Sequence, residues 1–194
     1  AVSLSTSGAG AGQAHPELFG TRELHSSSLR MFPKWRGMLE RFEGELAKCQ
    51  SGTCSPKTWQ SFVSRLRDAD PMTQLREVNR EMNAKRYIVD PVNWNLPDYW
   101  ATPFQFLRKN GDCEDYAISK YMALRDLGMP IDDMRIVVLQ DLNLRIAHAV
   151  LVVYLDGKAY VLDNQISRVV PATSIRHYQP AYSINEQGWW LHRS

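Results

Sequence analysis

Cys113 stands among charged residues at the predicted start of a helix. A thiol in the first turn of a helix lies near unpaired backbone N–H groups, which favour the thiolate and offer donors to an oxyanion. Asp112 precedes it, and Glu114 and Asp115 follow it, a setting that a buried structural cysteine rarely has. Two interpretations are open: a reactive nucleophile, or a small buried hydrophobic side chain, which is the usual role of a free cysteine.

A histidine and an aspartate are predicted to meet on one face of a β-hairpin. Asp156-Gly157 is a strong two-residue turn signal that fixes the register of the flanking strands. That register places His148 and Asp163 diagonally on one face, about 7 to 8 Å apart between backbones. A carboxylate that holds one ring nitrogen leaves the other free to act as a base, whereas the alternative is a half-buried histidine with a satisfied acid partner. If the helix start faces this hairpin, Cys113 completes a set of nucleophile, base and orienting acid.

The carboxylates around Cys113 suggest either a helix cap or a cation site. Asp112 and Asp115 have the spacing of a capping box. Three negative charges beside a cysteine, however, raise its pKa and oppose formation of the thiolate. A cation would resolve this conflict; hard carboxylate oxygens suit Ca²⁺, and no His or Cys spacing in the chain suits zinc. One turn supplies too few ligands, so others would have to come from elsewhere in the chain.

The elements that position these residues divide into a helical half and a β-rich half. Helical spacing of apolar residues predicts helices over 35–46, 59–66, about 71–82 and 113 to about 127. Alternation and β-branched residues predict strands over 135–140, 147–155 and 158–163, with a further hairpin within 178–192. The prolines within 85–103 predict an extended connection. Helices followed by an antiparallel sheet predict an α+β fold.

Size and composition are those of one globular domain. The chain has 194 residues, 44% of them hydrophobic and 23% charged. We expect a flexible leader over 1–28 and a single domain over 29–194, with a helical lobe over about 29–128 and a β lobe over about 129–194. The 23 basic and 21 acidic residues nearly balance and are scattered, which argues against a nucleic-acid or membrane-surface protein. No apolar run approaches the length of about 18 residues that a membrane span needs.

Two features suggest an exported protein. The chain starts with Ala1 and continues through small and polar residues without an apolar centre, as expected of a mature form whose export signal has been removed. An added, non-native N-terminal segment would look the same. Cys49 and Cys54 lie close together in sequence, and an oxidising compartment would favour a local disulfide between them. This leaves Cys113 as the free thiol. The alternative is two free cysteines that are neighbours by chance, because sequence does not give the geometry that a disulfide needs.

The segments around these residues resemble a known family. The run GDCEDYAISKYMALRDLGMP, then LNLRIAHAVLVVY and AYVLDNQ, resembles the bacterial transglutaminase-like cysteine proteases of the LapG type, as does the upstream DYWATP. The resemblance is close over about 94–165 and loose over the helical first half. It implies a papain/transglutaminase-like fold, with a helical lobe and an antiparallel sheet lobe. It also implies that Cys113 is the nucleophile at a helix N-terminus, His148 the base and Asp163 the orienting acid.

The resemblance further implies a bound calcium ion. Its carboxylate ligands would be Asp112, Glu114 and Asp115, and the backbone carbonyl of Tyr116 would add another oxygen. A ligand from the preceding loop is also expected, for which Asn93 is the first choice and Asn95 the second.

The implied function is that of a calcium-dependent periplasmic endoprotease. It would cleave a large LapA-like surface adhesin near its N-terminus at a paired-alanine site, releasing it and so controlling biofilm attachment and dispersal. A LapD-like inner-membrane receptor for cyclic di-GMP would hold the protease. Two alternatives stay open: a transglutaminase, in which an amine rather than water resolves the acyl-enzyme, and a non-catalytic calcium-binding module on the same scaffold.

Overall fold

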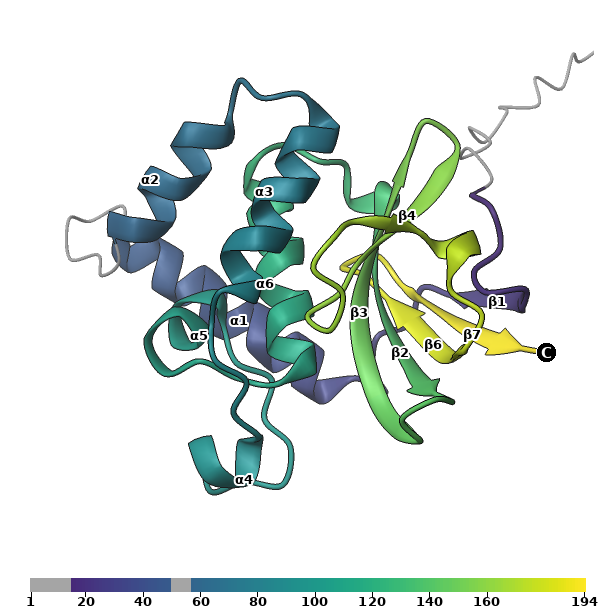
Figure 1. Cartoon of the computed structure of the whole chain (residues 1–194). Helices are drawn as coiled ribbons and strands as arrows, with labels where there is room; N and C mark the ends of the chain where they lie inside the picture. The colour runs from purple at the N-terminus through teal and green to yellow at the C-terminus, as the bar shows by residue number, and fades with distance from the viewer. Residues whose placement is uncertain (1–14, 50–56) are drawn as a thin grey trace, which may run out of the picture.

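The fold is α+β, with helices on one side of the molecule and an antiparallel sheet on the other (Figure 1). The structure is a computed structural model that describes residues 15–49 and 57–194. The expected fold class is therefore confirmed. No helix in these two ranges has the length and apolar character of a membrane span.

Six α-helices lie within the described residues: α1 (Pro33–Lys48), α2 (Lys57–Leu66), α3 (Pro71–Asn83), α4 (Asp90–Asn93), α5 (Pro103–Lys109) and α6 (Cys113–Asp126). Proline at the first helical position starts α1, α3 and α5, where its fixed φ suits a helix and its missing N–H costs nothing. Asp70 caps α3 by accepting from the Thr73 N–H at 3.0 Å. Helix α6 packs against α3, α5 and strands of the sheet, so its central residues are buried.

The strands of the described residues form one sheet in the order β1-β7-β6-β2-β3-β4-β5. Their bounds are β1 (Arg22–Ser26), β2 (Met134–Asp141), β3 (Ile146–Leu155), β4 (Lys158–Leu162), β5 (Val170–Pro171), β6 (Tyr178–Ile184) and β7 (Trp189–Arg193). The 3-10 helices η2 (Ile131–Asp133) and η3 (Ala172–Ser174) lie in the connections. Leu155 pairs with Lys158 across the Asp156-Gly157 turn, as the turn signal predicted.

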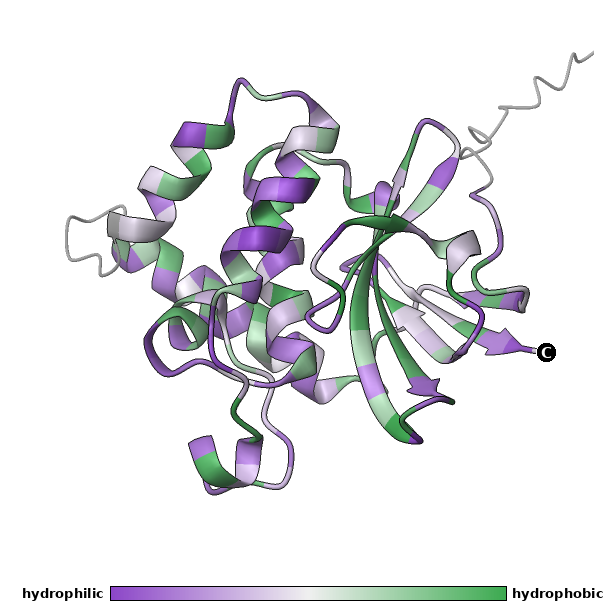
Figure 2. Cartoon of the chain, viewed as in Figure 1, coloured by the Kyte–Doolittle hydropathy of each residue, from purple (hydrophilic) through white to green (hydrophobic). Residues whose placement is uncertain are grey.

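Strand β3 is buried on both faces, which explains its nearly continuous apolar sequence (Figure 2). Leu151 and Val153 belong to the core cluster shared with the helices, whereas Val150 and Val152 belong to a second cluster on the opposite face. This alternation follows from the two-residue period of a strand. Leu18, which is fully buried, closes the second cluster.

Two expectations about connecting segments are corrected. The flexible leader expected over 1–28 is wrong for residues 15–28, because β1 pairs with β7 and Leu18 is buried, so both hydrogen bonds and apolar contacts order this segment. Residues 1–14 lie outside the described part of the chain. The connection within 85–103 is not wholly extended, since the one-turn helix α4 interrupts it.

Candidate active site

The start of α6 places Cys113 at the first position of a long, buried helix. The Asp115 carboxylate accepts a hydrogen bond from the Asp112 N–H at 3.4 Å, which is one half of the predicted capping box. Gly111 lies so close to this turn that a Cβ on it would stand 2.1 Å from Asp115 Oδ2. Only glycine therefore lets the chain approach the helix start at this position.

The Cys113 thiol lies between an acidic side chain and strand β3. Its S–H donates to Glu114 Oε2 at 3.2 Å, and the backbone N–H of Ala149 donates to the sulfur. Burial raises the pKa of the thiol above its usual range, and the negative charges of Glu114 and Asp112 raise it further, while the Ala149 N–H opposes them. The expected conflict between the carboxylates and a thiolate is therefore present. Ala149 directly follows His148, so the thiol and the imidazole come from elements in contact.

His148 and Asp163 form a buried pair. His148 Nε2 lies 2.9 Å from Asp163 Oδ1, and both side chains are almost fully shielded from solvent. The diagonal neighbours predicted from the hairpin register thus meet. Because Nε2 is held by the carboxylate, Nδ1 is the ring nitrogen left to exchange a proton.

Several donors hold the Asp163 carboxylate. Its Oδ1 also accepts from the Gln165 N–H at 2.8 Å, and its Oδ2 accepts from the Tyr178 hydroxyl. Burial by itself raises the pKa of Asp163, but the hydrogen bond and positive charge of His148, together with the other two donors, outweigh burial and lower it. The carboxylate therefore stays ionised beside the imidazole.

A buried lysine lies behind this pair and was not singled out from the sequence. Lys120 of α6 is fully buried, and its Nζ has no hydrogen-bond partner within the described ranges. Burial lowers its pKa to about 7, and the negative charge of Asp163 acts in the opposite direction. Nothing in the sequence indicated this position, because the apolar residues around Lys120 predict only that the helix packs against the core.

Four buried or half-buried carboxylates surround the start of α6. Carboxylate oxygens of Asp90, Asp112 and Asp115 lie within 4.8 Å of one another. Carboxylate oxygens of Asp90, Asp98 and Glu114 form a second group with the same spacing. Burial is the main cause that raises the pKa of Asp90 to about 6, of Asp115 to about 8 and of Glu114 to about 9, and neighbouring carboxylates raise each further. The predicted grouping of Asp112, Glu114 and Asp115 therefore gains Asp90 as a central member.

These carboxylates fit a hard cation. Asp90 Oδ1 and Asp112 Oδ1 are buried without a hydrogen-bond partner among the residues described. Backbone N–H groups hold other oxygens of the cluster in place: Ala101 donates to Asp115 Oδ1 at 2.7 Å, and Asp90 donates to Asp112 Oδ2 at 3.2 Å. An oriented set of carboxylate oxygens with two unused buried acceptors is the donor chemistry that Ca²⁺ takes. Asp98 is more exposed and forms an ion pair with Lys34, so it lies at the rim of this set.

The other predicted ligands are Asn93, Asn95 and the backbone carbonyl of Tyr116. The Asn93 side-chain N–H donates to the Asn110 carbonyl at 3.1 Å, and the Asn93 carbonyl accepts from Lys109 at 2.9 Å. Tyr116 is in the first turn of α6 and directly follows Asp115. Asn93, Asn95 and the Tyr116 carbonyl stay predictions. Asp90 stands before a proline in the segment expected to be extended, and its only signal in the sequence was its acidic side chain.

Comparisons with known proteins agree with this geometry. A model of the bacterial transglutaminase-like cysteine proteinases matches residues 44–192. Among solved structures, LapG of Legionella pneumophila is 35% identical over 69% of this chain and 76% of that chain, with a TM-score of 0.63, and its calcium-bound form gives the same values. The EGTA-treated form is 34% identical over 71% of this chain and 75% of that chain, with a TM-score of 0.64. No protein with a curated description matches the chain in sequence.

Proposed function

The chain belongs to the bacterial transglutaminase-like cysteine proteinases, and we propose that Cys113, His148 and Asp163 are its nucleophile, base and orienting acid. The observation that carries the proposal is the 2.9 Å hydrogen bond between His148 Nε2 and Asp163 Oδ1. His148 lies on β3, and the backbone N–H of the next residue, Ala149, donates to the Cys113 sulfur. The expected free-thiol state of Cys113 agrees with it, since Cys113 is the free cysteine of the described residues.

The geometry supports peptide hydrolysis in two stages. His148 Nδ1 takes the proton of the Cys113 thiol, and the sulfur attacks the scissile carbonyl carbon. Backbone N–H groups at the start of α6 face the developing oxyanion, and Asp163 stabilises the imidazolium. The imidazolium then gives its proton to the leaving amine, so an acyl-enzyme remains. A water molecule then gives a proton to His148 and attacks the acyl carbon. The bond from this carbon to the sulfur breaks, the carboxylic acid is released, and the imidazolium returns its proton to the sulfur.

Calcium is the cofactor in this proposal. Asp90, Asp112, Glu114 and Asp115 would hold the ion, and its positive charge would offset the carboxylates that disfavour a thiolate at Cys113. The similarity to LapG, for which calcium-bound and EGTA-treated structures exist, supports this assignment. Asn93 and the carbonyl of Tyr116 are further candidates for the coordination shell.

We propose a large surface adhesin as the substrate, cleaved near its N-terminus at paired alanines, in the periplasm. The partner would be an inner-membrane cyclic di-GMP receptor that holds the protease, so that adhesin release controls attachment and dispersal. The sequence resemblance and the 35% identity to LapG support this assignment. The family match spans residues 44–192, which include Cys113, His148 and Asp163.

Incubation with the N-terminal region of an adhesin that carries paired alanines tests the proposal. New N-termini at the alanines are expected from the wild-type protein with calcium, and none from Cys113→Ser. Replacing both alanines by bulky residues should stop cleavage. A labelled amine is added in a parallel reaction, because amine incorporation without new N-termini would identify a transglutaminase instead. Calcium binding with neither reaction would identify a non-catalytic module.

A further inference from the structure

Tyr178 contacts both members of the His148–Asp163 pair. It is the first residue of β6, and it is only 4% exposed. Its hydroxyl donates to Asp163 Oδ2, and its ring packs edge to face against the imidazole of His148, with ring centroids 5.9 Å apart. In the sheet, β2 lies between β6 and the strand of His148, and β2 and β3 lie between β6 and β4, which Asp163 follows, so side chains and not strand pairing make these contacts.

The Tyr178 hydroxyl supplies the donor to the second oxygen of the carboxylate. Oδ1 is taken by His148 and by the Gln165 N–H. Without Tyr178, Oδ2 would lose that donor in a buried position, and an unpartnered buried oxygen favours rotation or protonation of the carboxyl group. Either change would weaken the hydrogen bond between Asp163 Oδ1 and His148 Nε2.

The charged groups around this contact keep the donor and acceptor roles fixed. Burial, then the hydrogen bond to Asp163 and the charges of Asp163 and Asp141, raise the pKa of Tyr178 above its usual range, so the phenol stays protonated and donates. On α6, burial lowers the pKa of Lys120 to about 7, and the negative charge of Asp163 opposes this effect. His177 packs edge to face on the Tyr178 ring, with centroids 4.7 Å apart.

We infer that Tyr178 is a positioning residue, which holds the Asp163 carboxylate and the His148 ring so that Nδ1 faces Cys113. The inference rests on the proposed function, because it assigns to Tyr178 a role toward the proposed base. It does not depend on the identity of the substrate.

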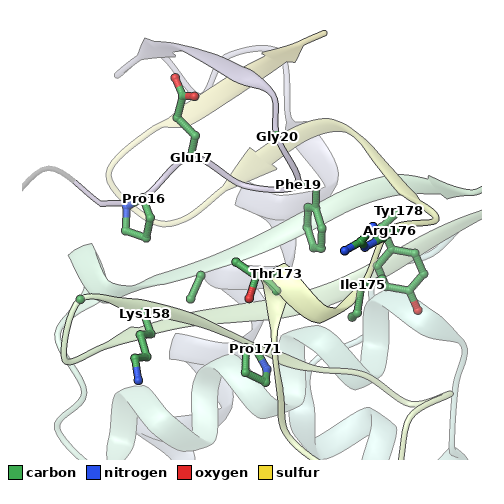
Figure 3. A pocket seen from close by; sticks show the side chains of 13 residues that line it. Pro16, Glu17, Phe19, Gly20, Lys158, Pro171, Thr173, Ile175, Arg176 and Tyr178 are labelled. Atoms are coloured by element: carbon green, nitrogen blue, oxygen red, sulfur yellow. The ribbon is translucent and has the colours of Figure 1, made fainter.

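The surroundings of Tyr178 make its hydroxyl separable from its ring. Figure 3 shows Tyr178 beside Ile175 and Arg176 at one end of a pocket of about 720 Å³, which Phe19 also lines. The ring packs on Phe19 with centroids 5.8 Å apart. Phenylalanine at position 178 would keep these ring contacts and remove only the bond to Asp163.

The test compares Tyr178→Phe with Tyr154→Phe, both in the full chain with saturating calcium. Tyr154 is the matched control: it is buried in the same core cluster, lies on the strand of His148, and its hydroxyl has no hydrogen-bond partner among the described residues. The two readouts are the rate at which iodoacetamide alkylates Cys113 and the NMR signal of the His148 ring N–H. Neither readout requires a protein substrate.

We expect Tyr178→Phe to slow alkylation by about tenfold, the lower end for a lost hydrogen bond to a charged group, and to move the His148 signal. Tyr154→Phe should leave both at wild-type values. Equal behaviour of the two variants would overturn the inference. If Tyr178→Phe does not fold, 3-fluorotyrosine at 178 strengthens the donor and should move the His148 signal, whereas the same group at 154 should not; no movement at either position would overturn the inference.

The proposed function fails separately. If a folded His148→Ala variant is alkylated at Cys113 at the wild-type rate, His148 is not the base that activates Cys113. The effect of Tyr178 on the His148 ring signal would still be decided by its own measurement.

Discussion

Asp90 and Asp115 bring carboxylate oxygens within 4.8 Å of each other in a buried cluster at the start of α6, although α4 and α6 are separate elements of the chain. Two negative charges at this distance repel each other, and burial disfavours the ionised form of both carboxyl groups. Their position beside Cys113 means that the ionisation of the cluster and the reactivity of the thiol are linked. The proposed calcium ion would offset the repulsion between the carboxylates and would favour the thiolate.

Removal of calcium is expected to silence proteolysis and to lower the thermal midpoint by about 5 °C or more. Calcium should restore both better than magnesium, because the strict octahedral shell of magnesium suits an irregular carboxylate cluster poorly. Chelator titration followed by thermal unfolding and a cleavage assay measures this. Full proteolysis in excess chelator, with no metal detectable in the protein, would mean that the carboxylates only cap the helix and do not bind a metal ion.

The metal-free protein should lose stability as the pH rises. The pKa values of Asp90 at about 6, Asp115 at about 8 and Glu114 at about 9 lie above those of the unfolded chain. The folded state therefore binds more protons, and its stability is fully present near pH 4 and is lost as the pH rises toward about 9. Chemical unfolding across this range measures the slope. Saturating calcium should flatten or reverse it, and a metal-free slope of the opposite sign would contradict the clustering.

Asp90→Asn should weaken calcium binding by about tenfold or more, because it removes one charge from the centre of the cluster. Asp68→Asn is the control, since Asp68 is an exposed aspartate outside the cluster. Asn93→Ala provides the comparison between Asp90, which the structure places in the carboxylate cluster, and the ligand predicted from the sequence. Calorimetric titration measures the calcium affinity of each variant. An unchanged affinity in Asp90→Asn together with a large loss in Asn93→Ala would identify Asn93, and not Asp90, as a calcium ligand.

Asp163→Asn should lower kcat by at least about 100-fold, because the amide cannot stabilise the imidazolium and favours the wrong ring tautomer. Asp156→Asn changes the same residue type in the turn of the same hairpin, where asparagine also tolerates the positive φ of 50°, and should leave kcat unchanged. Cleavage kinetics of the two variants provide the comparison. Equal kcat values would exclude Asp163 as the orienting acid.

Cys49 takes part in a disulfide, whereas Cys54, its expected partner, lies outside the described residues. We expect one reactive thiol, Cys113, in the unfolded protein without reductant, and three after reduction. Mass spectrometry after alkylation counts them. Three alkylated cysteines before reduction would exclude the bridge.

The sequence by itself determined the features that are local along the chain. Gly111-Asp112 placed the start of α6 with Cys113 at its first residue, and the Asp156-Gly157 turn set the register that brings His148 to Asp163. Both depend on backbone preferences and side-chain periods that act over a few residues. The acidic character of the helix start was equally legible from Asp112, Glu114 and Asp115.

Tertiary structure decided the contacts between distant segments. Asp90 joins the carboxylates because α4 folds back on the start of α6, and β1 pairs with β7 at the far edge of the sheet. Tyr178 contacts Asp163 although β2 and β3 lie between β6 and β4 in the sheet. Strand order and helix docking are set by burial of apolar surface and pairing of backbone groups over the whole chain, and neither has a local period in the sequence. The residues proposed to hold calcium and to position the base therefore emerged only when these elements were packed together.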